Sequence, residues 1–389
     1  MSNIPEDLVM DVLSRLWVKL LLRFRSVSKS WRTLIDSPSF IKIHMERSMK
    51  MKMAQSTVEV IHRCNRNKFY LLHLDLSRDP HPIRDPEELP HPFGHRYTSV
   101  AFKGLYQIRL VGSCNGLLCF VDCADCIVLW NLATRKYFQL QYLGIELPKS
   151  AIRDHYVNYG FGIELPKSAI RDHYVNYGFG YDSATDDYKV IRSITAFHNN
   201  LSVCTLVELY SLKSDSWTRL GDFMGFDFGV DYGILVGGAL YWIRYQRDIG
   251  SIIVAFDLTK EEFNFVPRPD LSGNFTLTNL GNYQGCLSLF FRSNEKADPS
   301  IVWVMKELGV KDSWTKVFSV DNTYSYMRNI DHSKSKSPTL SLWVKNKETL
   351  EWYNKEKKTL ENIKIYCEKG YLEAEFVHCE SLVGTSWFS

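Results

Sequence analysis

The side chains best suited to chemistry in this sequence are four cysteines close together in the chain, Cys114, Cys119, Cys123 and Cys126. A structural zinc ion takes four thiolate or imidazole ligands, usually from paired knuckles in two parts of a chain. Here there is one irregular run inside an apolar strand and hairpin, and no second knuckle. The spacing leaves a zinc site as an alternative but favours ordinary buried thiols, so no metal is expected.

Catalytic motifs are equally hard to find. No G-x-S-x-G elbow, H-E-x-x-H pair or P-loop occurs in the sequence. The stretch Gly178-Phe179-Gly180 lacks the third glycine of a dinucleotide-binding fingerprint. Carboxylates are plentiful, but no pair has a context that would make one an acid and the other a base. The sequence therefore predicts a non-catalytic protein with no cofactor, and an enzyme is the alternative.

Composition narrows the class of protein further. The chain has 389 residues, of which 45% are hydrophobic, 14% aromatic and 23% charged, as in globular proteins with one small and one large domain. A dispersed net charge of +3 gives no reason to expect nucleic acid as a partner. Charged residues interrupt the apolar run at 8–22, so neither export nor a membrane span is expected. Nine cysteines without an export signal favour reduced thiols in the cytoplasm and/or nucleus.

The first fifty residues have a helical pattern. Apolar residues recur at three- and four-residue spacing in the stretches "IPEDLVMDVLSRL" and "LLRFRSVSKSWRTLI". Pro5 followed by Glu6 and Asp7 is a good helix start, because proline suits the first turn and carboxylates meet the positive end of the helix dipole. So small a unit cannot bury stripes this wide, so another domain or chain should cover part of them. A helical cap packed on its own protein is the alternative to a binding module.

These stretches, together with "SPSFIKIH", resemble the F-box, a three-helix module that binds a Skp-type adaptor and, through it, a cullin ubiquitin ligase. The resemblance implies that Phe24, Val27, Trp31, Ile35 and Phe40 hold the helices together. It also implies an adaptor interface at or beside Ile4, Pro5, Leu8, Val12, Leu13, Leu16, Val18, Leu21 and Leu22.

The junction between the first two helices departs from the family pattern. Where the family usually has a proline, then valine and lysine, then a hydroxyl residue, this chain reads Trp17-Val18-Lys19-Leu20. Two turn signals, each worth about 1 kcal/mol, are lost. We expect adaptor binding to survive, and a ligase-independent binding module is the alternative.

After the helical region the pattern changes to short strands. The segments "TVEVI" and "KFYLLHLD" have the length and composition of strands, and the proline-rich stretch 73–95 indicates a loop. Later, "SCNGLLCFVD", "VGGALYWIRY" and "GNYQGCLSLFFR" each precede a second strand, and "SDSWTRL" recurs as "KDSWTKV". Such a pattern predicts a β-propeller, with a sandwich or irregular β domain as the alternative. Trp130, Trp217, Trp242 and Trp314 are expected in its core rather than on a recognition face.

This region resembles the F-box-associated domain of plant F-box proteins, the kelch-like type 1, in stretches such as "LWNLATRKYFQL", "YGFGYDSATDDYKVI" and "IVAFDLTKEEF". The combined resemblance implies an α+β multidomain protein: an F-box at residues 1–48, a linker at 49–56 and an all-β, propeller-like domain at 57–385. It implies a substrate-recognition subunit of a Skp–cullin–F-box ubiquitin ligase, which binds a protein substrate of unknown identity and promotes its ubiquitination and degradation.

Eighteen residues occur twice without a difference, at 144–161 and 162–179. Structural repeats normally drift in sequence and need about three copies to bury a shared core, so two identical copies fit a repeat fold poorly. A recent tandem duplication of one loop-and-strand segment, or an error in the gene model, explains them more simply. The sequence does not decide which copy enters the sheet.

Overall fold

The computed structural model describes most of the chain and divides it into two compact units, residues 1–140 with 327–389, and residues 141–326. We describe each unit by itself. The structure describes residues 5–54, 57–64, 68–75, 81–82, 85–90, 108–122, 125–140, 172–198, 201–223, 232–246, 250–295, 298–320, 327–329, 341–345, 349–354, 359–363, 373–378 and 381–384.

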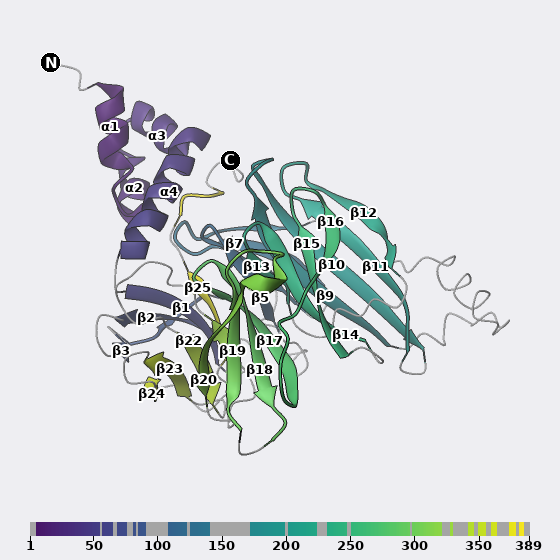
Figure 1. Cartoon of the computed structure of the whole chain (residues 1–389). Coiled ribbons are helices and arrows are strands. Elements are labelled where there is room, and N and C mark those ends of the chain that lie inside the picture. Colours follow the sequence, from purple (N-terminus) through teal and green to yellow (C-terminus); the bar gives the residue numbers. More distant parts are fainter. Residues whose placement is uncertain are drawn as a thin grey trace, which may run out of the picture. The chain divides into compact units, whose positions relative to one another are not determined.

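Four helices open the first unit and form what we call the helical module, residues 5–54 (Figure 1). They are α1 (Glu6–Leu13), α2 (Val18–Phe24), α3 (Lys29–Asp36) and α4 (Pro38–Ala54). The segment expected as a linker therefore continues α4 as far as Ala54. None of the described helices is long and apolar enough to cross a membrane.

The helix starts follow from local chemistry. Pro5 occupies the N-cap of α1, with the acidic Glu6 and Asp7 in its first turn. The Ser28 hydroxyl accepts a hydrogen bond of 3.1 Å from the amide of Trp31 and so caps α3. Helix α2 differs, because Trp17 at its N-cap has no hydroxyl or carboxylate to accept such a bond. The start of α2 thus has no side-chain cap.

Two β-sheets and a C-terminal sheet complete the first unit. The first contains β1 (Thr57–Cys64), β2 (Lys68–Asp75), β3 (His81–Pro82), β4 (Glu87–Glu88) and β25 (Glu373–His378). The second is β5 (Arg109–Cys114), β6 (Leu117–Val121), β7 (Ile127–Asn131) and β8 (Lys136–Gln139), and the third is β21 (Met327–Asn329), β22 (Ser341–Lys345), β23 (Thr349–Asn354) and β24 (Thr359–Ile363). Strand β25 pairs with β1, so the end of the chain completes its first sheet.

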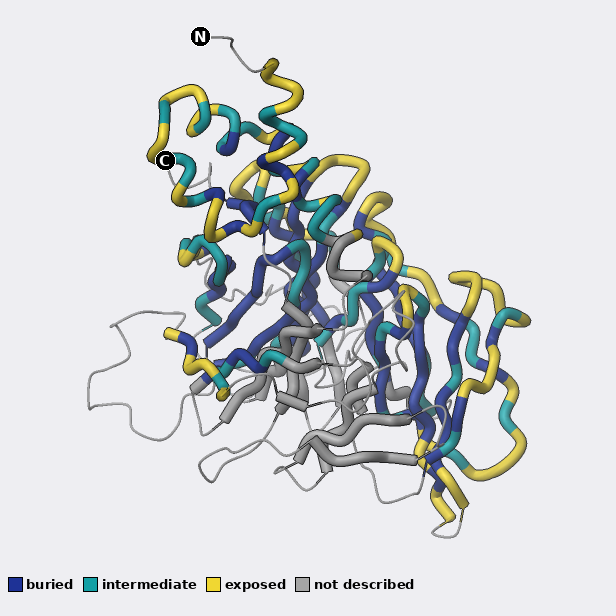
Figure 2. Tube along the Cα trace, turned by 90° about the vertical axis from the view of Figure 1, so that its left-hand side faces the viewer, coloured by how far each residue is buried: buried dark blue, intermediate teal, exposed yellow. Residues whose placement is uncertain are grey.

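The second unit contains three antiparallel sheets of four strands. They are β9 (Asp172–Asp182), β10 (Asp187–His198), β11 (Leu201–Ser211) and β12 (Ser216–Phe223); β13 (Ile234–Val236), β14 (Ala239–Gln246), β15 (Gly250–Asp257) and β16 (Glu262–Val266); and β17 (Phe275–Tyr283), β18 (Cys286–Ser293), β19 (Ser300–Met305) and β20 (Trp314–Val320), with a 3₁₀ turn at Lys311–Ser313. Apolar side chains pack between neighbouring sheets: the first and second share a cluster around Trp242, and the second and third share one around Leu289. Figure 2 shows long stretches of the described strands coloured as buried.

The hairpin turns explain the recurring sequence pattern. Asn115 and Gly116 connect β5 to β6 with φ of 51° and 80°, a two-residue turn that favours Asn-Gly because both residues have positive φ. The third and fourth strands of several sheets are joined instead by a four-residue turn whose last residue has positive φ. Arg135, Asp215 and Glu261 are such residues. Repeated hairpins of these two kinds produce the regular strand spacing.

The predicted strands are confirmed where the structure describes them. "TVEVI" and "KFYLLHLD" lie in β1 and β2, and the matching tryptophans Trp217 and Trp314 lie in β12 and β20, each the fourth strand of its sheet. The stretch expected as pure loop contributes β3 and β4, of two residues each. Pro82 fits there because β3 forms the edge of its sheet, where a missing amide hydrogen costs no ladder bond.

The second copy of the duplicated segment enters the sheet. Residues 172–179 of the second copy belong to β9, where Gly178 pairs with Ile191 of β10. Only this copy is followed by Gly180, Tyr181 and Asp182, which lead into the turn to β10. The first copy lies outside the described residues.

Candidate interaction surface

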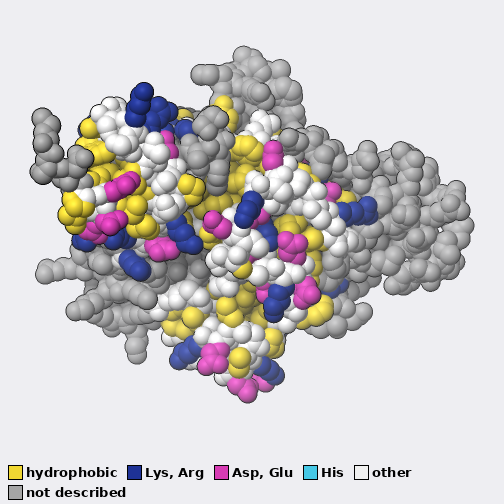
Figure 3. All heavy atoms as spheres, turned by 90° about the horizontal axis from the view of Figure 1, so that it is seen from above, with side chains coloured by type: hydrophobic (Ala, Val, Ile, Leu, Met, Phe, Trp, Pro, Cys, Tyr) yellow, Lys and Arg dark blue, Asp and Glu magenta, His cyan; other side chains and the backbone are white. Residues whose placement is uncertain are grey.

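Large apolar side chains lie exposed on the helical module. Leu8 and Val12 of α1 are each 58% exposed, Trp17 is 55% exposed and Leu20 of α2 is 36% exposed. We call these four residues the exposed α1–α2 surface. Figure 3, which views the molecule from above, shows hydrophobic side chains gathered on the helices among basic and acidic ones. Exposed apolar groups this large on so small a module are typical of a protein–protein interface.

The residues predicted for the adaptor interface divide into two groups. Pro5, Leu8 and Val12 are exposed, and Leu16 and Leu22 are partly buried. Leu13, Val18 and Leu21 are buried in the core of the module itself, and Ile4 lies outside the described residues. Helical geometry explains the division, because residues four apart such as Leu8 and Val12 share a face that Leu13 does not.

The residues expected to hold the helices together are also divided. Ile35 and Phe40 are buried in the core, and the Phe24 and Trp31 rings meet edge to face with centroids 5.6 Å apart. Val27 is 62% exposed, contrary to the expectation. It lies in the turn between α2 and α3, where its apolar side chain is outside the stripe that faces the core.

Polar contacts fasten α4 to the rest of the module. The Arg47 guanidinium donates hydrogen bonds to the Asp11 carboxylate at 2.8 Å and to the Asp11 carbonyl at 3.0 Å, and it also contacts the Ser14 hydroxyl. His44 is buried and its Nε2 lies 2.9 Å from the carbonyl oxygen of Leu16. These contacts hold α1 and the α1–α2 turn in place, and so they position the exposed α1–α2 surface.

Known families match both parts of the chain. The F-box domain family matches residues 1–43, and the F-box associated beta propeller domain family matches residues 59–383. The second match alone covers most of the chain. This protein belongs to the F-box proteins. The helical module is therefore the F-box, and α4 extends beyond the matched residues as far as Ala54.

The relatives are plant F-box proteins. The F-box protein CPR1 of Arabidopsis thaliana is 30% identical over 412 residues, which cover 99% of this chain and 90% of that protein. An F-box/kelch-repeat protein of the same plant is 28% identical, covering 84% of this chain and 82% of its own length. The β sheets of the present chain thus belong to a kelch-like, propeller-type domain, and the resemblance seen in the sequence is confirmed.

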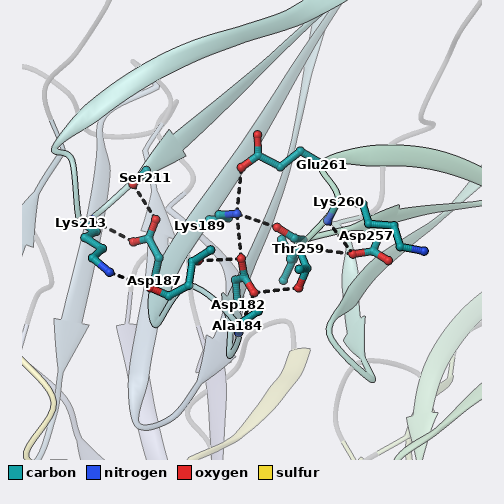
Figure 4. A network of polar contacts seen from close by, with 12 residues as sticks. Asp182, Ala184, Asp187, Lys189, Ser211, Lys213, Asp257, Thr259, Lys260 and Glu261 are labelled. Atoms are coloured by element: carbon teal, nitrogen blue, oxygen red, sulfur yellow. Dashed lines mark hydrogen bonds and ion pairs between the residues drawn. The ribbon is translucent and has the colours of Figure 1, made fainter.

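A second group of polar residues, centred on the buried Lys189 and Asp182, lies in the β domain and was not singled out from the sequence. Lys189 of β10 lies with its Nζ 3.0 Å from the Asp182 carboxylate, 2.9 Å from the Glu261 carboxylate and 2.6 Å from the Leu258 carbonyl oxygen (Figure 4). Thr259 and Thr185 donate hydrogen bonds of 2.8 and 2.7 Å to Asp182. The network joins the turn between β9 and β10 to the turn between β15 and β16.

The electrostatics of this network indicate a structural role. Burial of Asp182 opposes its ionisation, but hydrogen bonds from Thr185, Thr259 and Lys189 outweigh that effect and hold the pKa of Asp182 well below its usual range. Burial likewise opposes the charge on Lys189, yet Glu261 and Asp182 raise the pKa of Lys189 above its ordinary value. Both groups therefore stay charged and paired at neutral pH. Neither is poised to exchange a proton with a substrate.

The cysteines give no sign of a metal centre within the described residues. Cys119 is fully buried, and burial raises the pKa of its thiol far above the usual range, so it stays protonated. Cys114 and Cys126 are partly buried, and Cys123 lies outside the described residues. In the part of the chain that the structure describes, no three His, Cys, Asp or Glu residues are grouped so as to hold a metal ion.

The predicted core tryptophans are largely confirmed. Trp130, Trp242 and Trp314 are buried, and Trp217 is partly buried beneath the Arg192 guanidinium, whose central carbon lies 4.7 Å from the ring centre. Trp17 and Leu20 lie on the exposed α1–α2 surface but were not among the residues predicted for the adaptor interface. The sequence did contain a signal for this exposure. At the altered junction a tryptophan replaces a turn-forming proline, and its large apolar side chain is not needed to form the turn.

Proposed function

We propose that this protein is a substrate-recognition subunit of a Skp–cullin–F-box ubiquitin ligase. In this proposal the F-box binds a Skp-type adaptor and the β domain binds a protein substrate. The chain itself performs no bond chemistry. It raises the effective concentration of the substrate near the ubiquitin-transfer subunits, which promotes ubiquitination and degradation. The proposed location is the cytoplasm and/or nucleus.

The single observation that supports adaptor binding best is the exposed α1–α2 surface. Leu8, Val12 and Trp17 expose more than half of their surface on a module that belongs to the F-box family. Burying a large apolar side chain is worth about 1.5–3 kcal/mol, so these residues supply enough free energy for a specific contact. Their exposure favours a separate partner over the alternative that the helices merely cap their own β domain.

The β domain supports the substrate-binding half of the proposal through its family membership and its architecture. Strand β25 pairs with β1 in the first unit, and apolar clusters pack neighbouring sheets together in the second, so each unit offers a packed scaffold. Rigid scaffolds carry recognition on the loops that connect their strands. Those loops would determine which substrate binds, and the fold does not predict its identity.

The experiment is a binding measurement with purified adaptor and the full chain, by calorimetry. Replacing Leu8 and Val12 together by alanine should weaken adaptor binding at least about tenfold, because two apolar side chains that the adaptor would cover are shortened. The fold should survive, because both side chains are exposed and lie outside the F-box core. Phe265→Ala, at a 67% exposed side chain of β16, is the matched control and should leave the affinity unchanged.

Two results would contradict the proposal. One is a wild-type chain that never binds a Skp-type adaptor, and the other is a Leu8/Val12 double variant that binds as tightly as the wild type. The uncapped start of α2 at Trp17 then favours the second candidate, a binding module that acts outside any ligase.

A further inference from the structure

The end of the chain contacts two different parts of the first unit. Residues 381–384 follow β25, and all of them are buried. The Leu382 side chain is completely buried in the F-box core cluster with Leu13, Val18, Leu21 and others, although the family match assigns residue 382 to the β domain. Ala133, in the turn between β7 and β8, packs against the same cluster.

The backbone on either side of Leu382 is anchored to the sheet β5–β8. The Asn131 side-chain amide donates hydrogen bonds to the carbonyl oxygens of Ser381 at 3.0 Å and Val383 at 2.8 Å. The Ser381 hydroxyl donates a bond of 2.7 Å to the carbonyl oxygen of Asn115, in the turn between β5 and β6. Asn131 itself is buried, and its Oδ1 accepts a bond from the Thr134 amide at 3.1 Å. The two bonds from the Asn131 amide are buried, so breaking either leaves a polar group unpaired away from water.

The chain order makes this arrangement informative. Helix α4 leads from the F-box into β1, and one covalent connection alone would let the two parts move about a hinge. The segment 381–383 adds a second connection that arrives from the opposite end of the chain. Its two ends are held by the β5–β8 sheet while the side chain between them is held by the F-box. Two separate attachments remove the rotation that one attachment permits.

We propose that Ser381–Val383 acts as a positioning wedge that fixes the orientation of the F-box on the β5–β8 sheet, with Leu382 and Asn131 as its positioning residues. Its purpose rests on the proposed function: a fixed orientation holds a bound substrate at a constant distance from the adaptor, which keeps the effective concentration high for ubiquitin transfer. The wedge itself is a property of the free chain and can be tested without adaptor or substrate.

The test measures the distance between the F-box and the sheet in the full chain. Spin labels on noncanonical amino acids at Lys29 of α3 and Tyr137 of β8, both exposed, report that distance by double electron–electron resonance. The wild-type chain should give one narrow distribution. Leu382→Asp, which puts a carboxylate into the apolar cluster, should broaden the distribution roughly twofold as a hinge motion becomes free. Truncation after residue 380 should do the same, and Leu382→Met, which keeps apolar volume, should restore the narrow width.

Two controls separate positioning from simple loss of stability. Leu308→Asp introduces the same charge at a partly exposed leucine outside the F-box cluster and should leave the distribution narrow. Adaptor affinity measured on Leu382→Asp should stay near the wild-type value, because Leu8, Val12 and Trp17 are outside that cluster. If Leu382→Asp does not fold, Leu382→Ala and the truncated chain take its place in the same measurement.

The proposal is overturned if the wild-type distribution is already broad, or if the folded Leu382 variants keep the wild-type width. It is also overturned if the variants lose adaptor affinity while the distance stays narrow, since Leu382 would then only complete the F-box core. A wild-type chain that binds no adaptor contradicts the proposed function but leaves the distance result standing.

Discussion

The F-box and the β domain place their polar and apolar side chains in opposite ways. In the F-box, apolar groups such as Leu8 and Trp17 lie exposed, and the ion pair Arg15–Asp11 lies at the surface. In the second unit, Lys189 and Asp182 are almost fully buried and paired. A small module keeps apolar area uncovered when a partner is to cover it. A large β domain can bury charges because many neighbours are available to satisfy them.

The largest expected effect comes from breaking the buried network. Lys189→Met leaves the Asp182 carboxylate buried without its cation, which should lower the free energy of unfolding by about 3–5 kcal/mol. Chemical denaturation followed by tryptophan fluorescence measures it. Lys311→Met is the matched control, because Lys311 pairs with an exposed Asp270 at 2.8 Å, and should be nearly neutral. Equal effects at the two lysines would remove the contrast between buried and surface pairs.

A smaller effect should come from the packing between sheets in the second unit. A Cβ at Gly178 would lie 2.7 Å from the Trp242 ring and 2.9 Å from the Leu240 side chain. Gly178→Ala should therefore destabilise the unit by about 1–3 kcal/mol, because both neighbours are buried in the same apolar cluster and must shift. Gly285→Ala tests the opposite case: open space surrounds that glycine, and the cost is backbone strain at a φ of 77°. A lower melting temperature only for Gly285→Ala would show that turn geometry, and not packing, limits stability here.

A further prediction concerns pH and the F-box alone. Burial lowers the pKa of His44 below its ordinary value of 6.5, although the bond to Leu16 opposes the shift. As the pH falls below 6.5, His44 becomes protonated in the unfolded chain before it does in the folded F-box. The stability of the F-box is therefore highest above pH 6.5 and decreases as the pH falls. The loss cannot exceed about 1.4 kcal/mol for each pH unit. Hydrogen-exchange protection of α4 should be lower at pH 5.5 than at pH 7. In the His44→Gln variant the protection should be the same at both pH values.

The smallest effect should come from adding a side-chain cap to helix α2. Trp17→Ser supplies a hydroxyl at the N-cap of α2 and should stabilise that helix by about 1 kcal/mol. The same change removes an exposed aromatic side chain, so adaptor affinity should fall while hydrogen-exchange protection of α2 rises. Ser28→Ala is the reciprocal control at α3, where protection should fall by a similar amount. If stability and affinity instead rise together, Trp17 contributes nothing to the interface.

Interactions between residues close in the sequence determined many of the helix starts and turns of this protein. The helix start at Pro5, the cap at Ser28 and the Asn115-Gly116 turn act between residues close in sequence, so their types alone predict the elements. Family motifs then predicted both domains and the exposed position of Leu8. Burial was also predicted correctly for large apolar residues within strands, such as Trp130 and Trp242.

Tertiary structure decided the features that join distant residues. Leu8 and Leu13 were both predicted for the adaptor interface, and the packing of the helices places Leu13 in the core instead. Leu382 enters a cluster formed mostly by the first forty residues, and Lys189 meets Glu261 from another sheet. The second copy of the duplicated segment, which leads into the turn to β10, forms part of β9. Such contacts join residues that are far apart in the sequence, so the spacing of residues within one short segment cannot predict them.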